Sequence, residues 1–140
     1  MSPEVPIRGP LPQPTPLSQP FWDAARQHLL SIQRCTSCGA HIFYPRSGCT
    51  QCGRPELEWT EVSGRATVYS FTIARRPTVG ELADSVPYVV AIVELEEGPH
   101  MATNIVDCDP EQVRIGQPVE AVFEDVSDEI SLVHFRPTNA

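Results

Sequence analysis

The chain has 140 residues, 41% of them apolar, and a formal charge of −8 at pH 7. This length suits one domain, or a small domain with an appendage. All ten basic residues are arginines, which excludes a Schiff-base lysine, and their scatter weighs against a surface that neutralises nucleic-acid phosphates. No apolar run approaches the roughly 20 residues that a transmembrane helix needs, so we expect a cytoplasmic protein.

Residues 1–19 are predicted to form a proline-rich arm. Proline fixes φ and lacks an amide donor, so the arm should be extended and polyproline-like rather than packed. Two interpretations are open: a disordered tail, or an arm that lies along a partner subunit. The prolines within residues 1–20 are Pro3, Pro6, Pro10, Pro12, Pro14, Pro16 and Pro20.

A short helix is predicted over residues 19–29, because Ser18 is a suitable N-cap and proline is tolerated in the first turn. Trp22 and Arg26 lie on a different side from the apolar face. An exposed Trp22 would be a candidate for a partner interface. Alternatively, Trp22 would pack on the ribbon formed by the residues that follow the helix, and both interpretations stay open. The predicted apolar face consists of Phe21, Ala24, Ala25, His28 and Leu29.

Two C-x-x-C-G pairs follow, formed by Cys35 with Cys38 and by Cys49 with Cys52. A C-x-x-C turn directs both sulfurs to one point, and a glycine after it suits a left-handed backbone position. Two such turns facing each other supply four sulfur ligands in a tetrahedron, which predicts a closed, structural Zn²⁺ site. Iron would accept the same ligands, and spacing alone does not separate the two metals.

The helix and the predicted zinc ribbon together occupy residues 20–56. Short strands at residues 30–34 and 41–44 flank the first cysteine pair, and a unit this small depends on its metal to fold. A redox dithiol is disfavoured because it normally has one C-x-x-C beside a βαβ pattern. A disulfide framework is disfavoured because the N-terminal stretch lacks the pattern of a secretory signal.

From residue 57 onward the pattern is one of successive strands, with residues 57–62 as a lead-in and a helical turn after Asp109-Pro110. The turns have the spacing of a small barrel, and closure would remove exposed sheet edges. We therefore predict a mainly β protein, in which a five-stranded OB-type barrel over residues 57–140 follows a short helix and a four-cysteine zinc ribbon. The principal strands are predicted at residues 65–74, 87–95, 100–106, 119–126 and 130–136.

Residues 65–74 alternate strictly, which would place Tyr69 and Phe71 on one side of their strand, opposite Val68. The two aromatic rings would form a stacking platform for a base or, in the favoured interpretation, one wall of the core. Arg75 and Arg76 open a long loop that ends near residue 82. They would hold the phosphates of a nucleotide-like ligand or, in the favoured interpretation, pair with nearby carboxylates.

Nothing in the sequence supports catalysis by this chain alone. A catalytic site needs a nucleophile, a paired base or an open metal, and the four histidines are dispersed along the chain. Cys108 has no histidine in an obvious pairing with it, so an ordinary thiol is expected. Neither a glycine-rich phosphate loop nor a G-x-S-x-G motif is present.

A set of motifs between residues 21 and 137 resembles a known family. They are F-W-D-A at Phe21, R-C-x-x-C-G at Arg34, P-R-x-x-C-x-x-C-G at Pro45, E-W-x-x-V-S-G-x-A-T-V-Y-S-F-T at Glu58, P-Y-V-V-A-I-V-E-L at Pro87 and T-N-I-V-x-C-x-P-E at Thr103. The pattern is similar to the OB-fold proteins with an N-terminal rubredoxin-like zinc ribbon, an acyl-CoA-associated family once labelled a domain of unknown function.

The resemblance implies a non-catalytic accessory subunit of a thiolase-like enzyme. Partners in the family are thiolases, acyltransferases and retro-aldol side-chain lyases of lipid or steroid degradation, and some members are fused to hydratase-like domains. The helix and ribbon would dock on the partner in a hetero-oligomer, and the barrel would help form the acyl-CoA site. The residues expected at that interface are Phe21, Trp22, Arg26 and Tyr44.

The resemblance carries the four metal ligands onto Cys35, Cys38, Cys49 and Cys52, and it carries over no catalytic residue. Two alternatives to the accessory-subunit hypothesis remain at this stage. The first is a free-standing acyl-CoA-binding module. The second is a single-stranded nucleic-acid-binding OB protein, which the charge of −8 disfavours.

Overall fold

The computed structural model describes residues 11–76 and 86–138. Most of the predicted arm, and most of the loop that begins at Arg75, lie outside these ranges. The described elements, in chain order, are α1 (Gln19–Arg26), β1 (Ser31–Cys35), β2 (His41–Ile42), β3 (Leu57–Glu61), β4 (Arg65–Ala74), β5 (Tyr88–Leu95), β6 (His100–Ile105), the 3₁₀ turn η2 (Pro110–Gln112), β7 (Pro118–Asp125) and β8 (Ser131–Pro137).

The first three strands form a small antiparallel sheet in the order β2-β1-β3. β1 pairs with β3 over five register positions, from Ser31 opposite Glu61 to Cys35 opposite Leu57. Residues 57–61 were expected to lead into the barrel, but here they hydrogen-bond into the ribbon sheet. The division of the chain at residues 19 and 56 stays a prediction.

The other five strands close into a barrel in the order β4-β5-β6-β8-β7, a Greek-key arrangement of the OB type. The predicted fold class, mainly β with a five-stranded barrel after a short helix and a four-cysteine ribbon, is confirmed. Four barrel contacts are antiparallel, whereas β6 and β8 run parallel. Among the described residues, Ile105 opposite Phe135 is the one register position that joins β6 to β8.

The strict alternation predicted for residues 65–74 is wrong beyond Val68. The register between β4 and β5 shifts between Val68 and Ser70, so that Tyr69 is an extra residue in a β-bulge. Tyr69 is 56% exposed, whereas Phe71 lies opposite the buried Ala91 and packs on the core. The bulge therefore separates two side chains that simple alternation places on one face.

Helix α1 ends three residues earlier than predicted, at Arg26. His28 has φ +62, the amide of His28 donates to the carbonyl of Ala25, and that of Leu29 donates to the carbonyl of Ala24. This pattern is a Schellman motif with histidine in the left-handed position. His28 and Leu29 are therefore exposed, and of the predicted apolar face only Phe21 and Ala25 are fully buried.

The predicted side-chain cap at Ser18 is also wrong. Ser18 stands at the N-cap position, but its side chain makes no capping bond to the helix. Its Oγ instead accepts a 2.9 Å hydrogen bond from the amide of Thr15. The hydroxyl is thus engaged in the turn before the helix.

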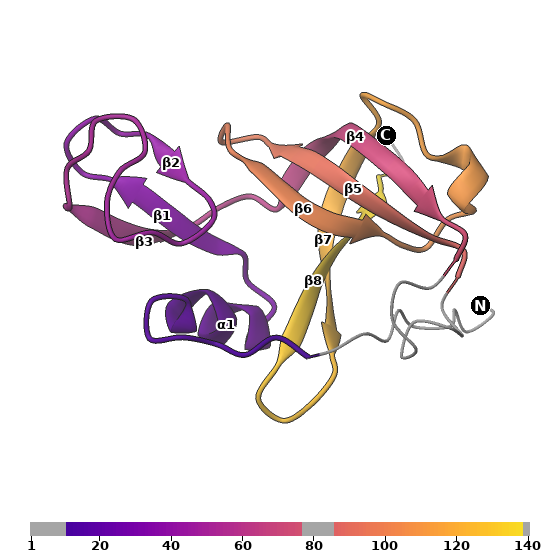
Figure 1. Ribbon diagram of the computed structural model, residues 1–140, viewed down its shortest axis with the longest axis horizontal. Helices are drawn as coiled ribbons and strands as arrows, with labels where there is room; N and C mark the ends of the chain where they lie inside the picture. The colour runs from indigo at the N-terminus through magenta and orange to yellow at the C-terminus, as the bar shows by residue number, and fades with distance from the viewer. Residues whose placement is uncertain (1–10, 77–85, 139–140) are drawn as a thin grey trace.

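One apolar core joins the helix, the ribbon and the barrel. Phe21 from α1 and Ile32 from β1 belong to the same buried cluster as Val68, Val93 and Phe135 of the barrel. Figure 1 shows the ribbon sheet beside the barrel, with α1 lying against the lower part of β8. His28 Nε2 lies 2.9 Å from Asp125 Oδ1, which fixes the end of the helix to the β7–β8 hairpin. Within the described ranges, no helix is long and apolar enough to span a membrane.

Candidate metal centre and aromatic cleft

The four cysteines of the two C-x-x-C-G pairs meet at one point, with all their sulfurs within 4.8 Å of one another. The Sγ atoms of Cys35 and Cys52 are 3.6 Å apart, and those of Cys38 and Cys49 are also 3.6 Å apart. A tetrahedron with metal–sulfur bonds of about 2.3 Å has edges of about 3.8 Å. The four sulfurs are therefore positioned for a zinc ribbon, and they leave no open coordination position.

Backbone geometry positions these sulfurs. The glycine after each pair has φ +80, and the amides of Gly39 and Gly53 donate to the carbonyls of Cys35 and Cys49 at 2.9 and 3.0 Å. The turns also direct amides at the first sulfur of each pair, from Cys38 to Cys35 Sγ and from Cys52 to Cys49 Sγ.

The amide donors shift the acidity of the thiols. The hydrogen bond from the Cys52 amide is the largest influence that lowers the pKa of Cys49, to about 6. The Arg54 amide favours the Cys52 thiolate, yet desolvation and the neighbouring sulfurs raise the pKa of Cys52 to about 11. Four thiolates so close together repel one another unless a cation neutralises them, which is the electrostatic requirement of a metal site.

A buried glutamine that the sequence analysis did not single out braces the second cysteine turn. Gln33 is 4% exposed. Its Nε2 donates to the carbonyl of Arg46 at 2.9 Å, and its Oε1 accepts from the amide of Arg46 at 2.7 Å. The only sequence feature that could have indicated this role is a polar amide side chain in the middle of the short strand predicted at residues 30–34.

An open cleft of about 530 Å³ lies between α1, the ribbon and the outer face of the barrel. Phe21 is the centre of its aromatic wall, with ring centroids 4.9 Å from Trp22 and 5.8 Å from Phe43. Trp22 is half-buried and packs on the core. Tyr44 completes this wall and is 53% exposed.

Three of the four residues predicted at a partner interface, Phe21, Trp22 and Tyr44, thus line one cleft. The fourth, Arg26, is exposed at the end of α1 and does not line it. Their role in contacting a partner stays a prediction.

His134 is a buried histidine of the cleft. It is 6% exposed, and its Nε2 lies 3.2 Å from Glu124 Oε1. Burial lowers the pKa of His134 although the nearby carboxylate opposes this shift. Its Nδ1 is buried and has no hydrogen-bond partner within the described ranges.

The residues predicted to bind a ligand do not gather at one site. Arg75 forms an exposed ion pair with Glu111, as the favoured interpretation had it, and Arg76 is exposed. Tyr69 lies against His100, with ring centroids 4.3 Å apart. A role in ligand binding for these arginines, Tyr69 or Phe71 stays a prediction.

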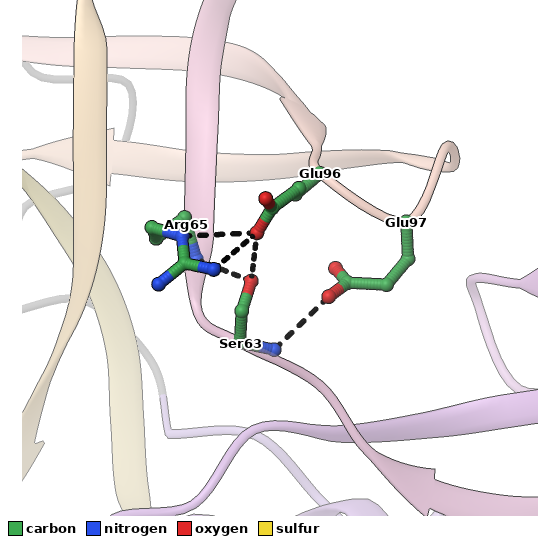
Figure 2. A network of polar contacts seen from close by, with 4 residues as sticks. All are labelled: Ser63, Arg65, Glu96 and Glu97. Atoms are coloured by element: carbon green, nitrogen blue, oxygen red, sulfur yellow. Dashed lines mark hydrogen bonds and ion pairs between the residues drawn. The ribbon is translucent and has the colours of Figure 1, made fainter.

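A polar network at the junction of ribbon and barrel was missed entirely. Figure 2 shows Ser63 and Arg65, from the segment that enters β4, facing Glu96 and Glu97 of the β5–β6 turn. Glu96 Oε2 accepts from Ser63 Oγ at 2.8 Å and from Arg65 Nε at 3.0 Å. The amide of Ser63 donates to Glu97 Oε2 at 3.0 Å. These contacts tie the segment between the two sheets to the barrel.

The fold and the cysteine cluster together define a class of protein, in which a rubredoxin-like ribbon precedes an OB barrel. Family models agree in both parts: the ChsH2 rubredoxin-like zinc ribbon domain matches residues 22–58, and the ChsH2 C-terminal OB-fold domain matches residues 59–124. The chain belongs to this ChsH2-type family, whose members also carry the name DUF35.

Relatives are similar over much of the chain. A DUF35 domain-containing scaffold protein of Methanothermobacter thermautotrophicus is 42% identical over 105 residues, which are 74% of this chain and 78% of that protein. A probable enoyl-CoA hydratase alpha subunit of Thermomonospora curvata is 39% identical over 118 residues, 84% of this chain but 36% of that protein.

A solved structure is similar in its fold. One chain of the structure described as an Ltp2-ChsH2(DUF35) aldolase is 35% identical and superposes with a TM-score of 0.80. The match covers 90% of this chain and 98% of that chain.

Proposed function

We propose that this chain is a non-catalytic accessory subunit that docks on a thiolase-superfamily enzyme and helps form its acyl-CoA site. The observation that carries the proposal is the similarity to one whole chain of a structure described as an aldolase. The name of the scaffold relative supports a subunit without a reaction of its own. The partner would be a thiolase, an acyltransferase or a retro-aldol lyase, and it would supply the reacting groups.

The metal of this subunit is a structural Zn²⁺ held by the four clustered cysteines. A closed shell of four sulfurs offers no position for water or substrate, so it stabilises the ribbon and takes no part in a reaction. The ribbon's own buried cluster is small, consisting of Cys35, Ile42 and Cys49 with Ala40 and Leu57 against it. Metal ligation therefore contributes most of what holds its loops together.

The docking surface is the aromatic wall of the cleft together with the exposed end of α1. Tyr44 presents a half-exposed ring beside Trp22, and Arg26 adds a cation at the edge. Aromatic residues and arginine are the side chains that contribute most strongly to protein interfaces. The same wall lies next to the barrel strands, so a partner bound there would enclose the cleft.

Co-expression with a thiolase-superfamily protein tests the proposal. We expect one complex on size-exclusion chromatography and an acyl-CoA cleavage or condensation activity that this chain lacks alone. A chain that stays separate from such partners but binds acyl-CoA would instead be a free-standing acyl-CoA module. Salt-sensitive binding of single-stranded oligonucleotides would support the nucleic-acid alternative.

A further inference from the structure

The N-terminal arm enters the described structure at the aromatic cleft. Pro12 lines the cleft together with the aromatic wall. Pro12 and Pro14 are half-buried, whereas Gln13 between them is exposed. Residues 1–10, with the sequence M-S-P-E-V-P-I-R-G-P, lie outside the described ranges. The arm is therefore already at the cleft where the described chain begins.

The spacing of the prolines suits a polyproline II segment that keeps one face on the cleft. Such a helix has three residues per turn, so Pro3, Pro6 and Pro12, which are separated by multiples of three, lie on one face. Gly9 stands at the remaining position of this face and adds no side chain. The rise of about 3.1 Å per residue takes the segment about 19 Å from Pro12 to Pro6. Residues 101–104 of β6, which line the cleft, cover about 10 Å at the rise of a strand, so the arm is long enough to pass them.

The cleft offers the groups that a polyproline segment binds. Segments with P-x-x-P spacing dock in grooves lined by aromatic rings, and residues 3–6, P-E-V-P, have this spacing. Trp22 and Tyr44 line the cleft, and each combines an apolar ring with a hydrogen-bond donor. Because a polyproline backbone makes no internal hydrogen bonds, its carbonyls are available to such donors.

His134 adds an acceptor for the amides of the arm. Its Nε2 lies 3.2 Å from Glu124 Oε1, so the proton of the neutral ring faces the carboxylate and Nδ1 is the acceptor nitrogen. His134 lines the cleft, and its buried Nδ1 has no partner within the described ranges. Buried polar atoms without a partner are uncommon. Between its prolines the arm keeps backbone amides, those of Val5, Ile7 and Arg8 among them, and one of these would supply the donor.

We propose that residues 3–12 of this chain lie in the aromatic cleft as a polyproline II segment, with Pro3, Pro6 and Pro12 facing the aromatic wall. The assignment goes beyond the proposed function and does not depend on it. The direct connection through Pro12 favours the chain's own arm over a segment of a second copy or of a partner. Because the arm is tethered there, docking loses less entropy than binding of a free peptide.

Trypsin provides the test, because the bond between Arg8 and Gly9 is a cleavable bond within the arm. Mass spectrometry measures the rate of this cut in the full chain and in a synthetic peptide of residues 1–16. Ala102 is exposed and lines the cleft, so Ala102→Phe fills the cleft without removing core packing. Thr67→Phe is the matched control, since Thr67 is exposed on β4 and lies outside the cleft. Thermal melts establish that both variants are folded.

We expect the Arg8–Gly9 bond to be cut about tenfold or more slowly in the full chain than in the peptide, because cleavage follows the fraction of arm that is undocked. Ala102→Phe should raise the rate to that of the peptide, and Thr67→Phe should leave it unchanged. Protection that survives Ala102→Phe overturns the assignment, and so does a full chain that is cut as fast as the peptide.

Backbone NMR locates the docked arm. Deleting residues 2–10 should shift the amide signals of residues 101–104 and 132–134, which line the cleft, and leave those of residues 65–67 of β4 in place. Pro6→Asp should reproduce part of these shifts, because Pro6 lies on the proposed contact face. Pro10→Asp, which changes another face of the polyproline helix by the same charge, should not. Cleft amides that the deletion leaves unmoved contradict the proposal.

Other occupants of the cleft give different results. If the Arg8–Gly9 bond is protected only at high protein concentration, the cleft holds the arm of a second copy and the assignment to the same chain is wrong. If the bond is cut as fast as in the peptide, and the cleft amides shift only when a thiolase-superfamily protein is added, the cleft belongs to the partner and the arm does not dock there.

Discussion

Ser63 Oγ donates a 2.8 Å hydrogen bond to Glu96 Oε2, and this contact fixes the segment between ribbon and barrel to the β5–β6 turn (Figure 2). The Ser63 hydroxyl is the largest influence that lowers the pKa of Glu96, and Arg65 adds to it. The contact bears on the proposed function because the aromatic cleft lies between the two parts that it joins. Its geometry depends on how the ribbon is held against the barrel.

Breaking this contact should loosen the junction without unfolding either part. In Ser63→Ala we expect the backbone amides of residues 62–64 to exchange hydrogen roughly fivefold faster, because the Ser63 hydroxyl no longer donates to Glu96 or accepts from the amide of Arg65. Hydrogen exchange read by mass spectrometry measures this. Glu94→Gln is the control, since Glu94 is exposed on β5 and outside the network. Unchanged exchange in Ser63→Ala would mean that the network does not hold the junction.

The four clustered cysteines should bind one zinc ion per chain, and each should be needed. Cys35→Ser, Cys38→Ser, Cys49→Ser and Cys52→Ser are each expected to lose stoichiometric zinc, measured by elemental analysis, and to lower the melting temperature. Cys108→Ser should keep the metal, because Cys108 lies outside the cluster. A folded, metal-free Cys38→Ser protein would contradict a structural role for the ion.

The same site should release zinc as the pH falls. Metal binding needs thiolates, so protons compete with it. The pKa of Cys49 near 6 favours that thiolate at neutral pH, whereas a pKa of about 11 keeps Cys52 protonated there until a cation binds. Zinc retained at pH 4 after dialysis would argue against an all-thiolate site.

The left-handed residue that ends α1 makes a specific prediction for His28. Both His28→Gly and His28→Ala lose the hydrogen bond to Asp125 and the stacking on Phe123. Only alanine also bears the cost of φ +62, which is roughly 1 kcal/mol for a residue with a Cβ. Urea denaturation should therefore show His28→Ala to be less stable than His28→Gly by about 1 kcal/mol. Equal stability of His28→Ala and His28→Gly would show that the left-handed conformation at this position carries no such cost.

His134 should make the folded chain less stable in mild acid. Burial lowers the pKa of His134 in the folded state, whereas an unfolded histidine titrates near 6.5. Above about pH 6.5 the ring is neutral in both the folded and the unfolded state. Below that value the unfolded chain takes up the proton first, so the free energy of unfolding decreases as the pH is lowered. His134→Gln does not titrate, so its melting temperature should fall less between pH 7.5 and 5.5. His100→Gln, an exposed control, should behave as the wild type does.

The parts of the fold that depend on local sequence were predictable. The four cysteines are fixed by two short turns, so their spacing predicts their meeting point. The five barrel strands follow from runs of strand-forming residues between turn residues, and even the turn after Asp109 is present as η2. The predicted ends of the barrel strands differ from the observed ends by no more than one or two residues, which is the accuracy that such patterns allow.

The parts that depend on distant residues were not predictable. Tyr69 leaves the alternation because of the register that β4 adopts against β5, and β3 joins the ribbon by pairing along the whole of β1. Histidine seldom occupies a left-handed helix end, so His28 gave no stop signal. The cleft combines α1, the ribbon and three barrel strands, and only the predicted interface residues Phe21, Trp22 and Tyr44 marked its place in the sequence.

The most direct test of the central proposal is the dissociation constant of the complex between this chain and a thiolase-superfamily partner. Tyr44 is half-exposed on the wall of the cleft, so Tyr44→Ala should leave the fold intact and weaken the complex roughly tenfold or more, as loss of an aromatic anchor does. Thr67→Ala should not change it. A measurable complex that Tyr44→Ala, Trp22→Ala and Arg26→Ala all leave unaltered, or no complex at all, would contradict the account.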